Sequence, residues 1–236
     1  MGAVIVIVVL VLAGAGFVFV LVRDVSKNKA RTADISSLGK ELGFTAGGQE
    51  DEGRLLDLPV EYLHRGDKRE TYNEIFGMRN GTRTALFDFG AYTMTGGTVA
   101  TGAAAAVRTK KHGHIVTCGL VEVPAQFPFL KIEHNHGAAP AGDARALSHV
   151  ELIAVFNDRF ELRADEQKFP NTVLADSLMR WLLAADEINT VEIKGAWILL
   201  ACDKLDSSRW RDLLTWLDEF REHIPAEVYS AYPVPA

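Results

Sequence analysis

The stretch Tyr72–Tyr92, YNEIFGMRNGTRTALFDFGAY, predicts two antiparallel strands joined by a tight turn. Its centre, Asn80-Gly81, is the strongest short hairpin signal, because a type I′ turn needs positive φ at both central residues and Asn and Gly adopt such values at low cost. Every second residue of the returning strand is apolar and falls on one face: Ala85, Phe87, Phe89 and Ala91. We expect this face to be buried.

The sequence after this hairpin predicts further strands and one loop. Residues 114–123 and 127–133 have strand character and are separated by Pro124. Residues 93–108, which precede them, are mostly Gly, Ala and Thr and are followed by Lys110 and Lys111. Because a segment this poor in large apolar side chains contributes little to a packed core, we expect a long mobile loop there.

The last third of the chain changes from strands to helices. A short strand is predicted at 160–163, helical periodicity at 174–185, and a second hairpin around Gly195 within residues 190–202. A final helix is predicted from the N-cap Ser207 to about His223. Strands and helices segregate along the chain, so the predicted fold class is α+β, with antiparallel hairpins and two or more C-terminal helices.

The first residues have a different character. From Gly2 to Val22 no side chain is charged, and about 20 apolar residues are enough for a helix to cross the hydrocarbon layer. A signal peptide would need a basic start and a small-residue cleavage site, and a buried core helix is usually shorter. We therefore expect a single transmembrane helix at 1–23, a linker at 24–53 and one soluble domain at 54–236.

Basic residues follow the uncharged stretch: Arg23, Lys27, Lys29 and Arg31. Because such residues are retained on the cytoplasmic side, they predict a single-pass protein of the cell membrane with its N-terminus outside and its C-terminal domain cytoplasmic. Contact with anionic lipid headgroups is a second role open to the same residues. The net charge of −6 disfavours a broad basic surface, so no nucleic acid is expected as a partner.

Three other features are given a structural interpretation. Cys118 and Cys202 are isolated in apolar runs, as expected for reduced thiols that act as small hydrophobes. The glycines of residues 96–102 lack the Lys that a P-loop needs, so nucleotide binding is not expected. Asp88 alternates with Phe87 and Phe89 and is expected to be exposed, a buried functional carboxylate being the alternative. No cofactor and no catalytic residue are predicted.

Two runs in the C-terminal part carry a resemblance: Phe156–Asp165, FNDRFELRAD, and Val173–Leu183, VLADSLMRWLL. They resemble the C-terminal part of bacterial membrane-anchored proteins in a domain family of unknown function. In that family a Phe-x-x-x-Phe strand and an acidic turn lead into a Leu-rich helix, a hairpin and a final helix. The resemblance covers roughly residues 150–224 and implies architecture and membrane location, but no catalytic residue. One predicted span departs from the two expected in many relatives.

Two histidine pairs are the candidate metal ligands. His112 and His114, and likewise His134 and His136, lie two residues apart, which places both rings on one face of a strand. If the pairs met in space, with Glu133 assisting, they could hold zinc or another divalent ion. Surface histidines in turns explain the same spacing, because zinc sites usually show a fuller ligand set.

The expected function is that of a non-enzymatic tethered module. An anchor, a basic cluster after it and the lack of a catalytic constellation favour an interaction or regulatory role at the lipid bilayer, with another membrane protein or an anionic lipid as partner. The alternative is a membrane-tethered metal-dependent hydrolase that uses the pairs His112/His114 and His134/His136. A pocket for a small apolar ligand in the β-rich half is a third interpretation.

Overall fold

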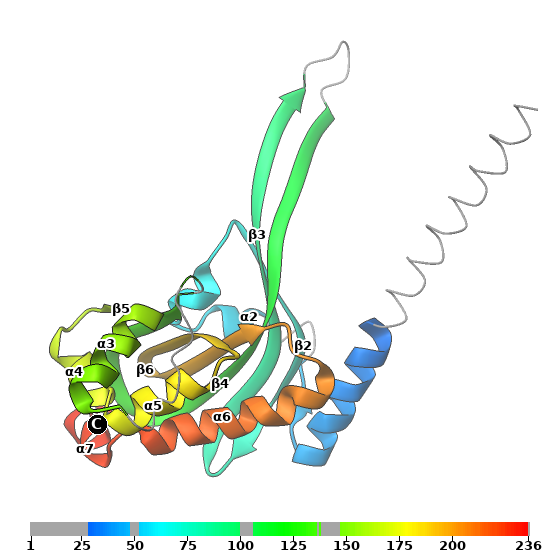
Figure 1. Cartoon of the computed structure of the whole chain (residues 1–236). Helices are drawn as coiled ribbons and strands as arrows, with labels where there is room; N and C mark the ends of the chain where they lie inside the picture. Colours follow the sequence, from blue (N-terminus) through cyan, green and yellow to red (C-terminus); the bar gives the residue numbers. More distant parts are fainter. Residues whose placement is uncertain (1–27, 48–51, 100–105, 136, 138–146, 236) are drawn as a thin grey trace, which may run out of the picture.

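The fold is built on one antiparallel sheet (Figure 1). The computed structural model describes residues 28–47, 52–99, 106–135, 137 and 147–235, without the side chains of 52, 53, 94–99 and 106–112. The strands follow the order β1-β2-β3-β4-β5, and β6 pairs with β4 as well. Their bounds are β1 Thr45–Ala46, β2 Lys68–Arg79, β3 Thr82–Val99, β4 Ala106–His134, β5 Phe160–Ala164 and β6 Ile188–Asp203.

Helices cover one face of the sheet, here called the inner face. They are a helix over residues 28–42, α3 His149–Arg159, α4 Lys168–Val173, α5 Asp176–Ala184, the short η3 Ser207–Arg209, α6 Trp210–His223 and α7 Ala226–Ala231. The longest of the labelled helices, α6, approaches the sheet closely at Gly119, where an added Cβ would lie 2.8 Å from Leu217 Cδ1. Glycine at this position therefore lets the leucine-rich stripe of α6 reach the strands.

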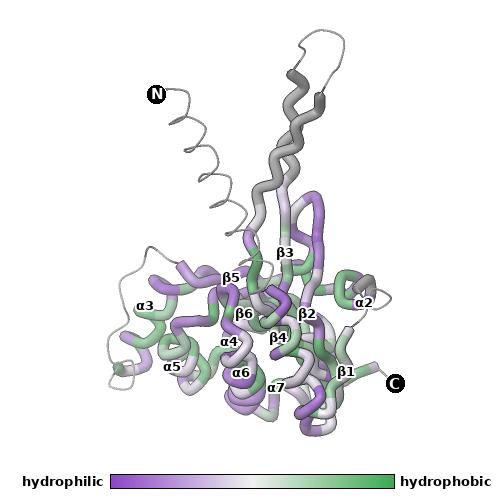
Figure 2. Tube along the Cα trace, turned by 90° about the vertical axis from the view of Figure 1, so that its right-hand side faces the viewer, coloured by the Kyte–Doolittle hydropathy of each residue, from purple (hydrophilic) through white to green (hydrophobic). Residues whose placement is uncertain are grey.

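A shorter segment covers part of the opposite face, here called the outer face. It contains α2 Glu52–Leu56 and the single-turn helix η1 Glu61–His64. In Figure 2 the strands lie between α3 and α5 on one side and α2 on the other. Each face has its own hydrophobic cluster, so both sides of the central strands are apolar. This arrangement is why the central parts of the two strands, residues 85–89 of β3 and 115–123 of β4, are mostly apolar in the sequence.

The structure confirms the elements with the clearest local signals. Arg79 pairs with Thr82 across the predicted turn, and the turn residues Asn80 and Gly81 have φ values of 50° and 76°. The predicted short strand is β5, the periodicity at 174–185 is α5, and the last predicted helix is η3 followed by α6. The predicted N-cap Ser207 is wrong, because Ser207 is the first residue of η3 and Asp206 precedes it. The apolar stripe of α6 is buried: Trp210, Leu213, Leu214, Leu217 and Phe220.

The mobile loop predicted at 93–108 is wrong for residues 93–99 and 106–108, and residues 100–105 of it lie outside the described residues. β3 continues to Val99 and β4 begins at Ala106, with an unbroken register from Thr84↔Val121 to Val99↔Ala106. Figure 1 shows this part of the two strands as a ribbon that projects from the body. The prediction considered only the apolar area that the side chains of this segment could bury. An antiparallel ribbon is also held by backbone hydrogen bonds, which glycine and threonine make as well as other residues do.

Two predicted strand breaks are also wrong. Pro124 does not separate two strands, because β4 passes through it with register shifts against β6 on both sides of Phe127. Gly195 is not a hairpin turn, since β6 runs through it with a φ of 58° opposite Phe127. A proline and a left-handed glycine are features of bulges as well as of turns, and here they bend long strands.

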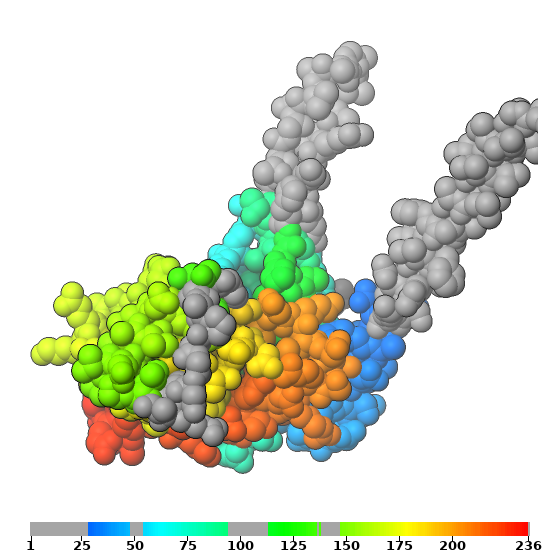
Figure 3. Space-filling view, viewed as in Figure 1, coloured from blue at the N-terminus to red at the C-terminus, as the bar shows by residue number. Residues whose placement is uncertain are grey.

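The predicted linker at 24–53 is wrong in its larger part, and the domain begins before residue 54. Residues 28–42 form a helix whose Ile35 and Leu38 are 1% and 7% exposed. This helix (blue) lies beside α6 (orange) in Figure 3, and Ser207 Oγ donates to Asp34 Oδ2 at 3.1 Å. The apolar positions are few among polar neighbours, so the amphipathic pattern was hidden in the sequence.

Two further expectations need correction. The Phe-x-x-x-Phe run is not one strand: Phe156 to Arg159 end α3, which begins with a capping box of Ser148 and Glu151, and Phe160 is the first residue of β5. The fold class is wrong in its membrane-spanning part, since none of the helices within the described ranges is long and apolar enough to cross a membrane. The segment predicted for that helix, residues 1–23, lies outside the described residues, as does Lys27.

Candidate functional site

The outer face of the sheet carries an apolar groove beside α2. Its floor is a row of residues aligned across three strands, in which Phe76 pairs with Ala85 and Ala85 pairs with Leu120. Leu55 and Leu58, in and just after α2, form the facing wall. The groove has a volume of about 400 Å³ and a mostly apolar lining. Sites for small molecules in proteins typically combine this size with such a lining.

Larger and partly polar side chains mark the mouth of the groove. Met78 is 62% exposed, which is unusual for a large apolar side chain in a strand. Arg83 Nε donates to Glu122 Oε2 at 2.6 Å, and its guanidinium lies 5.9 Å from the centroid of the Trp197 ring. Because Arg83 is itself largely exposed, this ion pair contributes little to folding stability and its cation stays accessible at the mouth.

The segment that contains η1 packs on the outer face next to the groove. Val60 and Leu63 of this segment pack in one apolar cluster with Phe87 and Cys118 of the sheet. Glu192, which is 0% exposed, holds η1 by accepting the backbone N–H of Glu61 at 2.5 Å and that of Tyr62 at 2.8 Å. Burial raises the pKa of Glu192, although these hydrogen bonds oppose the rise. The segment that contains η1 therefore covers the outer face at Phe87 and Cys118, which lie farther from the Asn80-Gly81 turn than the floor of the groove.

A buried ion pair ties the helix at residues 28–42 to the sheet. Arg31 donates to Asp88 through Nε at 3.1 Å and through Nη2 at 2.9 Å, and its Nη1 donates to the carbonyl of Leu205. Asp88 also accepts hydrogen bonds from Asn73 Nδ2 and Thr117 Oγ1, both at 2.8 Å. The carboxylate thus has four donor contacts from three side chains, which is the satisfied geometry that a buried charge requires.

This network corrects two expectations. Asp88 was expected to be exposed but is 1% exposed, because the face opposite Phe87 is covered by helices instead of facing solvent. Arg31 was expected to flank a membrane but its side chain is only 12% exposed and is committed to Asp88. Of the other predicted flanking residues, Lys29 is described and exposed, and Arg23 and Lys27 lie outside the described residues.

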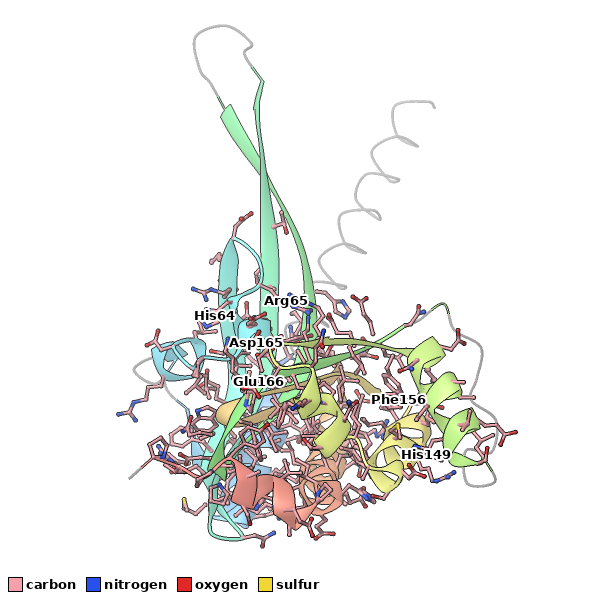
Figure 4. All side chains as sticks on the ribbon, turned by 90° about the vertical axis from the view of Figure 1, so that its left-hand side faces the viewer. His64, Arg65, His149, Phe156, Asp165 and Glu166 are labelled. Atoms are coloured by element: carbon pink, nitrogen blue, oxygen red, sulfur yellow. The ribbon has the colours of Figure 1, made fainter. Side chains whose placement is uncertain are left out.

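A second charged cluster lies on the outer face beside η1 (Figure 4). Glu133 pairs with Arg65 and with Lys131, whose side chain is 5% exposed. Partial burial disfavours the charged carboxylate, but the hydrogen bonds from Lys131 and Arg65 outweigh it and lower the pKa of Glu133. Figure 4 places Arg65 well away from Phe156 and His149 of α3. Glu133 is therefore committed to cations of the protein itself.

The candidate metal ligands do not converge. His114 and His134 lie on the same strand, 20 residues apart, and at about 3.3 Å per residue their separation far exceeds what one ion can bridge. His114 contacts Asp203 at 3.4 Å, and His134 Nε2 accepts a hydrogen bond from Arg159 Nε at 3.0 Å. His136 and the side chain of His112 lie outside the described part. Within that part, no group of three or more His, Cys, Asp or Glu side chains could hold a metal ion.

The two cysteines behave as the sequence indicates. Cys118 and Cys202 are free and fully buried. Cys118 belongs to the cluster of the outer face and Cys202 to that of the inner face, so the sheet separates their side chains. Burial raises the pKa of Cys118 well above its ordinary value and that of Cys202 to about 12. Both thiols therefore stay protonated and unreactive at neutral pH.

Reasoning from the sequence offered a pocket for a small apolar ligand in the β-rich half but did not identify its residues. These residues come from five strands, from α2 and from the segment after it, and none of them belongs to a motif. The usable signal was Ala85, a small residue that is followed on the same face of its strand by the large residues Phe87 and Phe89. A small side chain between large ones leaves room above the sheet, but the sequence does not show which residues surround that room.

Comparisons with known proteins place the fold in a known architecture. The chain matches no protein-family model and no curated protein. Among solved structures, it is similar to the crystal structure of the mycobacterial trehalose monomycolate transport factor A, TtfA, with a TM-score of 0.56 and 13% identity. The similarity covers 87% of this chain and 98% of that one. At this identity the likeness shows a shared fold, and the resemblance of residues 150–224 stays a prediction.

Proposed function

We propose that the chain is a non-enzymatic binding module that works at the cytoplasmic face of a membrane and takes the acyl chain of a lipid into the groove of the outer face. The observation that carries this proposal is the groove itself, with its apolar floor of Phe76, Ala85 and Leu120. A methylene group is about as large as a water molecule, which occupies about 30 Å³ in the liquid. The volume of the groove thus fits on the order of a dozen methylene groups.

The mouth of the groove suits a polar headgroup. Arg83 and Trp197 lie together there, and Arg54 of α2 lines the same groove. A guanidinium can bind a phosphate or carboxylate through two parallel hydrogen bonds, and an indole ring suits the boundary between apolar and wet surroundings. An amphiphile with an anionic headgroup would therefore place its charge beside Arg83 and its chain against the floor.

Two further observations support a role with lipids. The solved structure reported above, which shares this fold, is described as the mycobacterial trehalose monomycolate transport factor A. In the present chain, residues 2–22 are uncharged and apolar, which favours association with a membrane. We infer an accessory role in lipid handling, in which the module binds its ligand without chemical change.

A quenching experiment tests the proposal. The full chain in a mild detergent is titrated with 12-bromododecanoic acid, whose bromine quenches indole fluorescence at short range. We expect saturable quenching that is lost in Trp197→Phe, because Trp197 is the tryptophan that lines the groove. Quenching that is equal in both proteins would show that the acid binds elsewhere and would refute the assignment.

Filling the groove gives an independent test. Ala85→Phe places a ring on the floor, and we expect it to abolish saturable binding while leaving the fold intact, since Phe suits a strand. The matched control is Ala226→Phe, at an exposed position in α7 away from the groove. Unchanged binding in Ala85→Phe, or equal loss in both variants, would contradict the proposal. Leu55→Gln, which makes the facing wall polar, should weaken binding without filling the space.

A further inference from the structure

The ends of β3 and β4 form a two-stranded arm, defined here as residues 93–99 and 106–115. The pairing of β2 with β3 ends at Lys68↔Tyr92, and that of β6 with β4 ends at Val116↔Asp203. Beyond these points the two strands pair only with each other among the described residues. Seven residues of β3 at about 3.3 Å each give the arm a reach of roughly 23 Å, and Figure 1 shows it projecting from the body.

The arm is positively charged in an acidic protein. The sequence from Phe89 to Val121 contains no Asp or Glu, although the whole chain has a net charge of −6. Its basic residues all lie on β4: Arg108, Lys110 and Lys111, followed by His112 and His114. In the register, the residues from Arg108 to His112 stand opposite uncharged residues of β3, from Thr93 to Gly97, and His114 stands opposite Ala91. The sequence of both strands of the arm contains no acidic residue.

The base of the arm lies at the same end of the domain as the start of the helix over residues 28–42. Arg31 of that helix binds Asp88 of β3, and Thr32 Oγ1 donates to Asn73 Oδ1 of β2 at 2.8 Å. Figure 1 shows the first turn of this helix (blue) on the side from which the arm projects. Lys29 is exposed in this turn, and Arg23 and Lys27 precede it in the sequence. The exposed charge of Lys29 therefore lies at the same end of the domain as the base of the arm.

We propose that this arm docks on an anionic membrane surface. Anionic headgroups attract clustered Lys and Arg side chains, and the attraction acts within about one Debye length, so a projecting ribbon reaches the surface before the acidic body does. The arm and the groove lie at opposite ends of β3, since the mouth of the groove is at Arg83 near the Asn80-Gly81 turn. Docking by the arm holds the mouth of the groove away from the bilayer.

The proposal predicts that a fluorescent label in the arm responds to anionic vesicles and that a label at the groove does not. The full chain with Thr109→Cys, in the arm, or with Met78→Cys, at the groove, is labelled with an environment-sensitive fluorophore. Cys118 and Cys202 are buried, so the introduced thiol is the one that reacts. With vesicles that contain phosphatidylglycerol, we expect a blue-shifted, brighter emission from position 109 and no change from position 78. With phosphatidylcholine alone, neither label should respond, and high salt should reverse the response.

Charge removal separates docking from binding in the groove. Replacing Arg108, Lys110 and Lys111 together by Gln should abolish the response of the label at position 109 and leave quenching by 12-bromododecanoic acid unchanged. The matched control replaces Lys40, Lys168 and Lys194 by Gln, which removes the same charge elsewhere and should leave the response intact. An equal response at positions 109 and 78, a response to neutral vesicles, or equal loss in both triple variants would overturn the proposal.

Discussion

Replacing Asp88 tests whether the buried ion pair makes the helix at 28–42 part of the domain. Asp88→Ala removes the acceptor of Arg31 and of two other side chains, Asn73 and Thr117. Arg31 then stays in a site where its side chain is 12% exposed, with one carbonyl as its remaining acceptor. Breaking a buried pair on one side costs about 3–5 kcal/mol, because the partner charge is left uncompensated.

The expected loss of folding free energy is a large fraction of the stability of a typical domain, which is about 5–15 kcal/mol. With a urea dependence of about 2 kcal/mol per molar, a loss of about 3 kcal/mol lowers the midpoint of unfolding by roughly 1.5 M. The assay is urea unfolding of the full chain in a non-ionic detergent, followed by tryptophan fluorescence. Asp203→Ala is the control, since its side chain is 78% exposed and its loss should cost less than about 0.5 kcal/mol.

A double-mutant cycle separates this pair from general damage. Arg31→Met combined with Asp88→Ala should be less destabilised than the sum of the single changes, by about 1–3 kcal/mol, because the second change removes the stranded charge. Additive effects would show that the two side chains do not act as a pair. A midpoint for Asp88→Ala that matches the control would refute the assignment of the helix to the core.

Three further predictions follow from the groove, the charged cluster and the arm. The binding free energy of saturated fatty acids in the groove should become more favourable by about 0.8 kcal/mol for each added methylene group and level off near a dozen methylene groups, as measured by displacement of the brominated acid. An affinity that does not depend on chain length would exclude an apolar groove. Glu133→Gln should cost about 1–3 kcal/mol at pH 7, since Lys131 loses its acceptor. The pKa of Glu133 in the folded protein is lowered from its ordinary value of 4.5, so the stability that the carboxylate contributes is present above pH 4.5 and is lost as the pH falls through the pKa of the folded state. The unfolding midpoints of the variant and the wild type should therefore converge in acid. A difference between the midpoints that does not change with pH would argue against the ion pairs. Gly113→Val should loosen the base of the arm, because a Cβ there would lie 2.0 Å from Tyr92 Cδ1, and faster amide exchange at 93–99 is the expected result; unchanged exchange would contradict this packing.

Local signals in the sequence predicted the elements that depend on neighbours in the chain. The Asn80-Gly81 hairpin and the helix that ends before Pro225 follow from turn chemistry and from 3.6-residue periodicity, and the structure confirms both. Gly195 and Pro124 misled the prediction because each signals a turn as readily as a bulge. What decides between them is pairing with a distant strand, which no local pattern contains.

The site depended on contacts that join distant parts of the sequence. Asp88 meets Arg31 across 57 positions, and Glu192 meets Tyr62 across 130, so neither partnership could be read from spacing. The histidine pairs gave a regular local spacing, but His114 and His134, the members of the two pairs whose side chains are described, lie 20 residues apart on one long strand. The groove needed the register of β2, β3 and β4 together, which the sequence did not provide.

Photo-crosslinking with a fatty acid tests the central claim most directly. The full chain is incubated with a C12 fatty acid that carries a diazirine near its methyl end, illuminated, digested and mapped by tandem mass spectrometry. We predict crosslinks at Leu55, Leu58 and Phe76, the wall and floor of the groove, that are competed by unlabelled acid and absent in Ala85→Phe. Crosslinks scattered over the surface, or crosslinks at the groove that unlabelled acid does not compete, would contradict the account.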